Sequence, residues 1–309
     1  MLGLKLVDAC IEVNTPNPAK FLESIRSEFT RRYLPTVTSN ECSRVSAVIY
    51  WLSGGEFKVL SANYSEKGPD TYVVQGGFPE AYVNESPAFF LVQVFARSLA
   101  KEGYVMLTDS ISIEARGKTV LLLGFPHTGK STMASIAISL GYTVYSTENT
   151  VVKPEERRIR VVAGTRVLVY DPRVRELYGV TLESATRTKH GYEVIDLDEV
   201  APPPSSQPVD EIYVIYTSFN SYGASLVPIK GRKVEKTLWY FATSLLKGMD
   251  YYYPQPLDMP LTGPVANTIH QFIKTIRENY VDRFYEAFGS PLEVLKAITS
   301  QRLPSKPLA

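Results

Sequence analysis

The chain has 309 residues, 44% of them hydrophobic, and its 33 Lys and Arg nearly balance 32 Asp and Glu. A chain of this length can bury a large core as one domain or as two modest ones, and its balanced charge argues against a nucleic acid or an anionic membrane as partner. Two cysteines, Cys10 and Cys42, and three scattered histidines are too few for a disulfide framework or a metal quartet, so structural zinc is not expected.

The first residues lack the basic flank and long apolar core of a signal peptide. No uncharged apolar run reaches the roughly 18 residues that would span a bilayer. We therefore expect a soluble, cytoplasmic protein with no membrane partner.

Residues 1–103 read as an α+β region whose strands pair in antiparallel fashion. Asn17 followed by Pro18 is typical of a helix start, a cap and then a first-turn proline. The expected elements are a strand over 3–13, a helix from Pro18 to Tyr33, a hairpin of 44–53 with 57–62, a strand over 71–75 and a buried helix from Pro87 to Gly103.

From residue 104 the pattern changes to an α/β sheet with a helical C-terminal segment, and we predict a second region over residues 104–309. The expected strands are 104–115, 119–123, 142–146 and 211–219, and the expected helices are 131–140, 238–246, 265–288 and 291–298. The proline-rich segment 201–208 is expected to be a stiff surface excursion. The aromatic and proline-rich segment 249–263 suits a lid, a docking patch or ordinary packing.

The most informative stretch is residues 119–131, with the sequence TVLLLGFPHTGKS. An apolar strand leads into G-x-x-x-x-G-K-S and then a helix, which is the context expected of a phosphate-binding loop rather than of a simple glycine turn. The glycines let backbone N–H groups turn toward phosphate oxygens, and the helix start faces the anion. The sequence therefore predicts binding of ATP with Mg²⁺. The residues expected to bind the nucleotide are Gly124, Pro126, His127, Thr128, Gly129, Lys130, Ser131 and Thr132, with Lys130 on the terminal phosphates and Ser131 on the metal.

Hydrolysis or transfer requires a second catalytic element, and Glu148 is the best candidate. It lies at the end of the strand that follows the loop's helix, where ligands bind in open α/β sheets. A carboxylate there suits Mg²⁺ or a proton from an attacking hydroxyl, although an ordinary strand end has the same appearance. Asp109 is a weaker second carboxylate.

Three further groups of charged residues each have a functional interpretation and a purely structural one. The basic stretch Arg187, Lys189 and His190 precedes a glycine and suits contact with phosphate or a second substrate, or plain surface charge. Acidic residues near 197 suit a metal site or a turn; they are Asp196, Asp198 and Glu199. Arginines of the segment 151–179 are expected on a solvated sheet face; they are Arg157, Arg158, Arg160 and Arg166.

Residues 110–150 resemble the C-terminal kinase domain of HPr kinase/phosphorylase, whose phosphate-loop core is shared with phosphoenolpyruvate carboxykinases. The resembling features are the strand pair, the loop, a short helix, a glycine, a strand and an acidic position. A looser likeness to the family's substrate loop covers 190–197. The resemblance implies an α/β fold with a phosphate-loop sheet of this type and helices on both faces, a kinase activity, and possible homo-oligomers.

The chain departs from the family at three positions. The family's Asp-Asp pair aligns with Thr147 and Glu148, so the first acid, usually assigned as the proton acceptor, is missing. The family's histidine ahead of the loop falls at Thr108, and its substrate-loop arginine falls at His190. These departures affect the protein-serine phosphotransfer that the resemblance implies.

Three functions follow from these patterns. The first is a Mg²⁺- and ATP-dependent kinase, with Lys130 and Glu148 as catalytic residues, Ser131 and Glu148 as metal ligands, and a small-molecule or protein hydroxyl as acceptor. The second is a nucleotide-binding sensor or regulatory protein with little turnover. The third is a RecA-like ATPase, which the short helix and the neutral charge disfavour.

Overall fold

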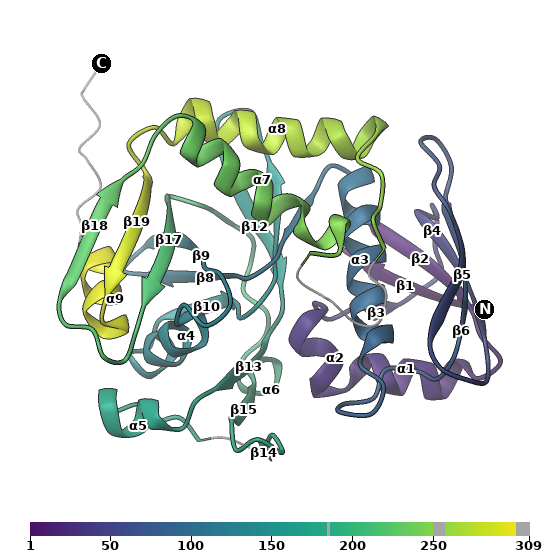
Figure 1. Ribbon diagram of the computed structural model, residues 1–309, viewed down its shortest axis with the longest axis horizontal. Helices are drawn as coiled ribbons and strands as arrows, with labels where there is room; N and C mark the ends of the chain where they lie inside the picture. The colour runs from purple at the N-terminus through teal and green to yellow at the C-terminus, as the bar shows by residue number, and fades with distance from the viewer. Residues whose placement is uncertain (184–185, 250–256, 301–309) are drawn as a thin grey trace.

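The computed structural model describes residues 1–183, 186–249 and 257–300. Within these residues the chain is a mixed α/β structure with two six-stranded sheets, one four-stranded sheet and one three-stranded sheet (Figure 1). No helix in the described ranges combines the length and the apolar content that crossing a bilayer requires. The cytoplasmic location and the possible homo-oligomer stay predictions.

The N-terminal sheet has the strand order β3-β1-β2-β4-β6-β5. Its strands are β1 (Leu2–Leu6), β2 (Ala9–Asn14), β3 (Thr38–Ser39), β4 (Ala47–Leu52), β5 (Lys58–Asn63) and β6 (Asp70–Gln75). The single strand predicted over 3–13 is wrong, because Val7 takes a φ of 54° and the chain folds back into the antiparallel pair β1 and β2.

The hairpin predicted from 44–53 and 57–62 is also wrong. Strand β6 lies between β4 and β5, parallel to β4 and antiparallel to β5. The burial pattern explains the order, because β5 is largely exposed, with Leu60 half in solvent, and suits an edge. Strand β6 buries alternate residues, so it takes the inner position.

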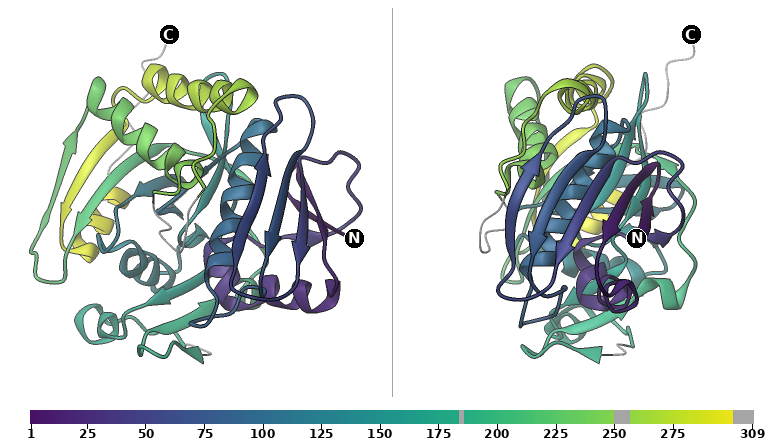
Figure 2. Two further views of the ribbon diagram at one scale, coloured as in Figure 1. Left: turned by 45° about the vertical axis from the view of Figure 1, so that its right-hand side comes forward. Right: turned by 90° about the vertical axis from the view of Figure 1, so that its right-hand side faces the viewer.

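The expected helix from Pro18 to Tyr33 is divided into α1 (Pro18–Arg26) and α2 (Glu28–Tyr33). Ser27 is extended, with ψ of 149°, and its side chain accepts a hydrogen bond from Thr30 N and so caps the second helix. Helix α3 (Ser86–Lys101) is buried almost all round, as its composition predicts, and lies behind the N-terminal sheet in the right-hand view of Figure 2. Arg97 of α3 donates to Asp70 at 2.7 Å.

Cys10 and Cys42 form a disulfide, with their Cα atoms 5.7 Å apart. This bond was not predicted from the sequence. The low cysteine count excludes a framework of several disulfides but not one bond between segments that fold together. Here Asn40 N donates to Gly3 O and holds the segment of Cys42 beside β1, whose partner strand β2 carries Cys10.

The central sheet has the order β10-β8-β9-β17-β19-β18. Its strands are β8 (Ser110–Ala115), β9 (Lys118–Leu123), β10 (Thr143–Ser146), β17 (Glu211–Thr217), β18 (Ala224–Pro228) and β19 (Phe284–Gly289). Strands β9, β17 and β19 are parallel.

Helices cover both faces of the central sheet, as the side chains of β9 show. Val120 and Leu122 join a core with α4 (Lys130–Ser139) and α9 (Pro291–Ser300). Leu121 joins the other core, which contains α7 (Arg232–Lys247) and α8 (Gly263–Asn279). Alternation along a strand sends successive side chains to opposite faces, so a continuous apolar run here fits a sheet that is buried on both sides.

The long helix predicted over 265–288 is wrong in its second half, because α8 ends at Asn279 and β19 follows. The buried Tyr280 ends the helix: its hydroxyl donates to Val209 O at 2.8 Å and accepts from Ile159 N at 3.1 Å. These bonds fix the chain at the edge of the sheet, and β19 then enters between β17 and β18.

Two small sheets and two short helices complete the described chain. The four-stranded sheet has the order β16-β12-β11-β7 and the three-stranded sheet the order β13-β15-β14. The bounds are β7 (Val105–Leu107), β11 (Thr150–Pro154), β12 (Ile159–Gly164), β16 (Gln207–Pro208), β13 (Val167–Tyr170), β14 (Thr186–Arg187), β15 (Glu193–Asp196), α5 (Arg173–Tyr178) and α6 (Leu197–Val200).

The arginines of this part do not all lie on a solvated face. Arg157 is exposed, and Arg158 and Arg160 pair with Glu155 near the surface at 2.7 and 3.0 Å. Arg166 is buried, so the expectation fails there. It donates to Asp198 at 2.6 Å and to three backbone carbonyl groups.

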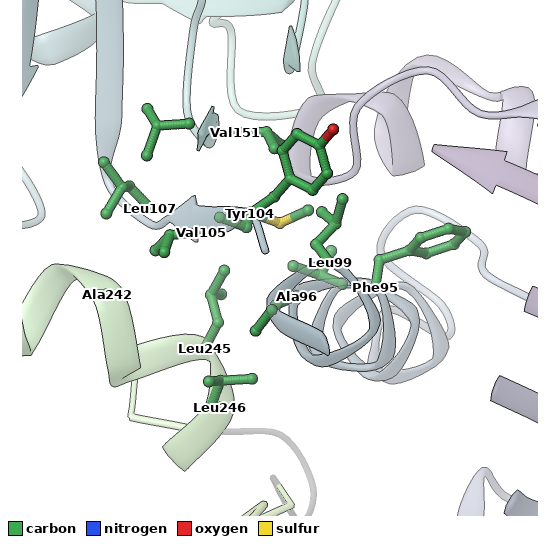
Figure 3. Close-up of a cluster of buried hydrophobic side chains, with 14 of the residues drawn as sticks. Phe95, Ala96, Leu99, Tyr104, Val105, Leu107, Val151, Ala242, Leu245 and Leu246 are labelled. Carbon is green, nitrogen blue, oxygen red and sulfur yellow. The ribbon is translucent and has the colours of Figure 1, made fainter. Parts of the chain in front are cut away.

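The two predicted regions share a hydrophobic core. Figure 3 shows side chains of α3, such as Ala96 and Leu99, packed with Tyr104 and Leu107 around β7 and with Leu245 of α7. The predicted division between residues 103 and 104 falls inside this cluster and stays a prediction. Of the segment 249–263, residues 250–256 lie outside the described residues, so the lid and docking interpretations are not tested there.

Candidate functional site

The predicted phosphate-binding loop connects β9 to α4. Thr128 closes a turn on Phe125, because its backbone N and its Oγ1 both donate to Phe125 O, at 3.2 and 2.8 Å. His127 has a φ of 64°, which is unusual for a residue with a side chain. The turn brings the chain back across the end of β9 before the helix begins.

Both glycines of the motif are required by close contacts. A Cβ atom on Gly124 would lie 2.4 Å from Thr128 Oγ1 and 2.9 Å from Ile215 Cγ1. Gly129 has a φ of 93°, and a Cβ atom there would lie 2.0 Å from Thr217 Oγ1. That same hydroxyl donates to Thr128 O at 2.7 Å, so the end of β17 anchors the loop.

The N-terminus of α4 has an open backbone end. Gly129 occupies the N-cap position, and within the described residues no side chain accepts a hydrogen bond from the first turn. The first N–H groups of a helix have no partner inside it, and they carry the positive end of the helix dipole. This end is therefore suited to an anion.

Lys130 is buried and bound on all sides by the protein. Its Nζ lies 2.5 Å from Asp109 Oδ1, 2.8 Å from Gly124 O and 3.1 Å from Phe125 O. An ammonium group has three protons to donate, so these three acceptors satisfy it. For Lys130 to contact a phosphate, at least one of them must be exchanged.

A cavity of about 700 Å³ lies over the loop. Eight of the predicted site residues line it: Pro126, His127, Gly129, Lys130, Ser131, Thr132, Glu148 and His190. Gly124 and Thr128 are not among the described lining residues, and their contacts belong to the loop's own turn. The structure thus brings together the loop, the strand-end carboxylate and one residue of the basic stretch.

Glu148 lies just beyond β10 and contributes its side chain to the cavity lining. Its backbone is fixed, since Glu148 N donates to Thr165 Oγ1 at 2.9 Å and Glu148 O accepts from Ser110 N at 2.8 Å. Burial raises the pKa of the Tyr33 hydroxyl to about 12, with Arg32 opposing the shift and Glu148 adding to it.

Thr147, which the sequence resemblance aligns with an acidic residue, is buried and is not among the described lining residues of the cavity. Its Oγ1 donates to Thr165 O at 3.1 Å and to Val167 O at 3.0 Å, and the residue is 2% exposed. An Asp in this orientation would face carbonyl groups. The local backbone therefore does not present position 147 to a ligand.

The basic stretch forms a hairpin rather than an irregular loop. Arg187 in β14 pairs with the buried Glu193 at 3.2 Å, and Lys189 Nζ lies 4.0 Å from the centre of the Tyr82 ring. Neither is among the described lining residues of the cavity. His190 packs edge-on against Tyr82, with ring centroids 5.7 Å apart, and does line it.

The N-terminal region contributes a cavity wall that the sequence did not reveal. Arg32 and Tyr33 come from α2, and Tyr82 and Phe89 come from the start of α3 and the segment before it. No local pattern marks these residues, because only the tertiary fold brings them to the loop. Asp171 follows β13 and Thr217 is the last residue of β17, and their strand-end positions were a usable signal.

Two of the acidic residues near 197, Asp196 and Asp198, are bound by arginines, and Glu199 is exposed. Arg31 donates to Asp196 and, at 2.7 Å, to Asp198, which also accepts from Arg166. Among the described residues no group of three or more His, Cys, Asp or Glu could hold a metal ion. A Mg²⁺ ion takes few protein ligands and keeps waters and phosphate oxygens, so the Ser131 hydroxyl and Glu148 in one cavity fit it.

Neither a family model nor a curated protein sequence matches the chain. Among solved structures it is similar to the Hpr(Ser) kinase/phosphatase from Coxiella burnetii, at 13% sequence identity and a TM-score of 0.24. The similarity covers 40% of this chain and 72% of that chain. A likeness this weak indicates a related fold at most.

Proposed function

We propose that this protein binds ATP with Mg²⁺ at the loop between β9 and α4 and transfers the terminal phosphoryl group to a hydroxyl. One observation carries the proposal. The open N-terminus of α4, Lys130 and the Glu148 carboxylate line a single cavity of about 700 Å³. A cavity of this size is in the range of nucleotide and cofactor sites.

Each residue has a role set by its position. Backbone N–H groups at the start of α4 bind phosphate oxygens, and Lys130 exchanges one of its protein acceptors for a terminal phosphate. The Ser131 hydroxyl and Glu148 would hold Mg²⁺, which neutralises charge on the phosphates, and a carboxylate there can also take a proton. The acceptor hydroxyl, on a small molecule or a protein, enters from the side of His190.

Single-turnover assays with γ-labelled ATP, Mg²⁺ and a panel of hydroxyl compounds test the proposal. The panel contains a seryl peptide, free serine, glycerol and a hexose. Lys130→Ala is expected to weaken Mg–ATP binding about 10- to 100-fold, because it removes a charge-assisted hydrogen bond. Glu148→Gln is expected to slow turnover on the order of 100-fold.

Two exposed residues provide matched controls. Lys230→Ala and Glu293→Gln change surface ion pairs, with Asp282 and Lys296 respectively, and should leave binding and turnover unchanged. No transfer to any acceptor, together with equal slow hydrolysis by the wild type and both site variants, would contradict the kinase proposal.

A second candidate function is a nucleotide-binding sensor. The inward orientation of Thr147 favours it, since the position that supplies an acid in the resembling family presents no side chain to the cavity. It predicts tight Mg–ATP binding by calorimetry, a change of conformation or oligomeric state, and turnover at background. Measurable transfer that depends on Glu148 would exclude it.

A further inference from the structure

The cavity lining contains three carboxylates, and their surroundings differ. Asp171 is bound by Arg173 at 2.5 Å, which lowers the pKa of this carboxyl through the side-chain hydrogen bond. Glu148 follows β10 and lines the same cavity as Ser131 of the proposed metal site. Asp109 lies at the base of the cavity, 6% exposed, directly against Lys130.

The backbone fixes Asp109 beside the loop. Asp109 has a φ of 49° in the turn between β7 and β8, a left-handed conformation that is uncommon for a residue with a side chain. Its carbonyl oxygen accepts a hydrogen bond from Gly124 N, the first residue of the loop, at 3.0 Å. The side chain is thus held one hydrogen bond from the lysine that is expected to reach the terminal phosphate.

We propose that Asp109 is the residue that accepts the proton of the attacking hydroxyl, in place of the acid missing at position 147. The inference rests on the proposed phosphoryl transfer and assigns its proton acceptor. Asp109 is suited to the role because it combines burial, contact with Lys130 and access to the cavity. Thr147 lacks an acid and faces inward, and Asp171 is held by its arginine.

The reaction begins with an exchange of partners. In the structure the Lys130 ammonium group uses its three protons on Asp109, Gly124 O and Phe125 O. When the nucleotide enters, Lys130 turns one N–H from the Asp109 carboxylate to a terminal phosphate oxygen, so one anionic acceptor replaces another. A carboxylate that loses an ammonium partner binds a proton more readily.

The transfer step then balances with no further reactant. The acceptor oxygen forms a bond to the γ-phosphorus while the bond from that phosphorus to the β,γ-bridging oxygen breaks. The electron pair of the broken bond stays on ADP, and the hydroxyl proton moves to Asp109. Release of the phosphorylated product and ADP lets Asp109 give the proton to solvent and pair with Lys130 again.

The test compares wild type, Asp109→Asn and Asp109→Glu by calorimetric titration with Mg–ATP and by single turnover of Mg–[γ-³²P]ATP. The acceptor is the best compound of the hydroxyl panel, or water if none accepts. Asp109→Asn keeps the shape and still accepts from Lys130, so its Kd should equal or fall below that of the wild type. Its turnover should fall about 10²- to 10⁴-fold, and Asp109→Glu should recover part of the rate.

Asp282→Asn, an exposed carboxylate paired with Lys230, is the matched control and should turn over as the wild type does. Turnover of Asp109→Asn within about threefold of the wild type would overturn the assignment. So would weaker Mg–ATP binding with a rate restored by high Mg²⁺, because that result identifies a metal ligand. Failure of the wild type itself to bind or turn over Mg–ATP would instead overturn the proposed function, and the assignment with it.

Discussion

The starts of α1 and α2 differ from the start of α4 in how they use their backbone N–H groups. In the N-terminal region, Asn17 Oδ1 accepts from Lys20 N at 3.1 Å at the start of α1, and Ser27 Oγ accepts from Thr30 N at 3.3 Å at the start of α2. In the central region, α4 starts at Gly129, and no described side chain caps it. The first two helix ends are satisfied by the chain itself, and the third opens into a cavity.

This difference indicates where the molecule can bind an anion. A side-chain cap satisfies one of the N–H groups that a phosphate would otherwise use. A glycine at the N-cap leaves these groups to a ligand, at some cost in helix stability when no ligand is bound. The two regions have similar six-stranded sheets. Helix α7 also starts at an uncapped glycine, Gly231, but the start of α4 opens into the cavity that Lys130 and Glu148 line.

The largest loss of Mg–ATP affinity is expected when a side chain is introduced at Gly129, at the open N-terminus of α4. In Gly129→Ala a Cβ atom would lie 2.0 Å from Thr217 Oγ1 at a φ of 93°, so the loop must shift off β17. We expect Mg–ATP affinity to fall at least about 100-fold by calorimetry. The matched control is Gly141→Ala, where φ is 77° but no described atom lies within 4 Å.

Gly141→Ala should cost about 1 kcal/mol of stability through its backbone conformation and leave the nucleotide affinity unchanged. Equal affinities for Gly129→Ala and the wild type would show that the loop does not bind the phosphates.

The loop itself could be predicted from the sequence because its geometry depends on residues that are adjacent in the chain. The strand, the turn and the helix over 118–139 lie where the pattern places them. The ion pair between Lys130 and Asp109 could not be predicted in the same way. It joins residues 21 positions apart through the fold of β8 against β9.

A smaller effect, on the free energy of unfolding, is expected at the contact between the two regions. There Asp198 accepts hydrogen bonds from Arg31 of α2 and from Arg166. Burial acts to raise the pKa of the Asp198 carboxyl, but hydrogen bonds from Thr36 and Arg166 outweigh it, so the pKa lies below its ordinary 3.8. Asp198→Asn should cost about 2 kcal/mol of unfolding free energy at neutral pH.

Because the folded-state pKa is depressed, this stabilisation is present above the unfolded-state value and is lost as the pH falls through the folded-state value. Denaturation curves of wild type and variant should therefore converge below about pH 4. A difference in unfolding free energy that persists unchanged in acid would contradict the ion-pair explanation.

The smallest effect is expected at a capped end. Asn17→Ala removes the acceptor for Lys20 N and should cost about 1 kcal/mol, measured by chemical denaturation. It should leave Mg–ATP affinity unchanged, because α1 is not part of the cavity lining. A loss of Mg–ATP binding free energy larger than the loss of unfolding free energy would contradict the distinction between helix starts capped by a side chain and the open start of α4.

The wrong predictions share one physical cause, which is that local patterns do not determine strand order or chain reversal. The segment that follows α8 is apolar enough to extend a helix, but hydrogen bonds of the Tyr280 hydroxyl end the helix and β19 joins the sheet. Likewise β4 and β5 are near in sequence, yet the better buried β6 lies between them. The cavity wall from α2 was not predicted for the same reason.

The most direct test of the account is to follow backbone amide resonances of the ¹⁵N-labelled protein while Mg–ATP is added. Saturable shifts are expected at residues 129–132, at the open start of α4, and none at residues 19–20, at the capped start of α1. Saturable binding that leaves residues 129–132 unshifted, or that shifts both helix starts equally, would contradict the account.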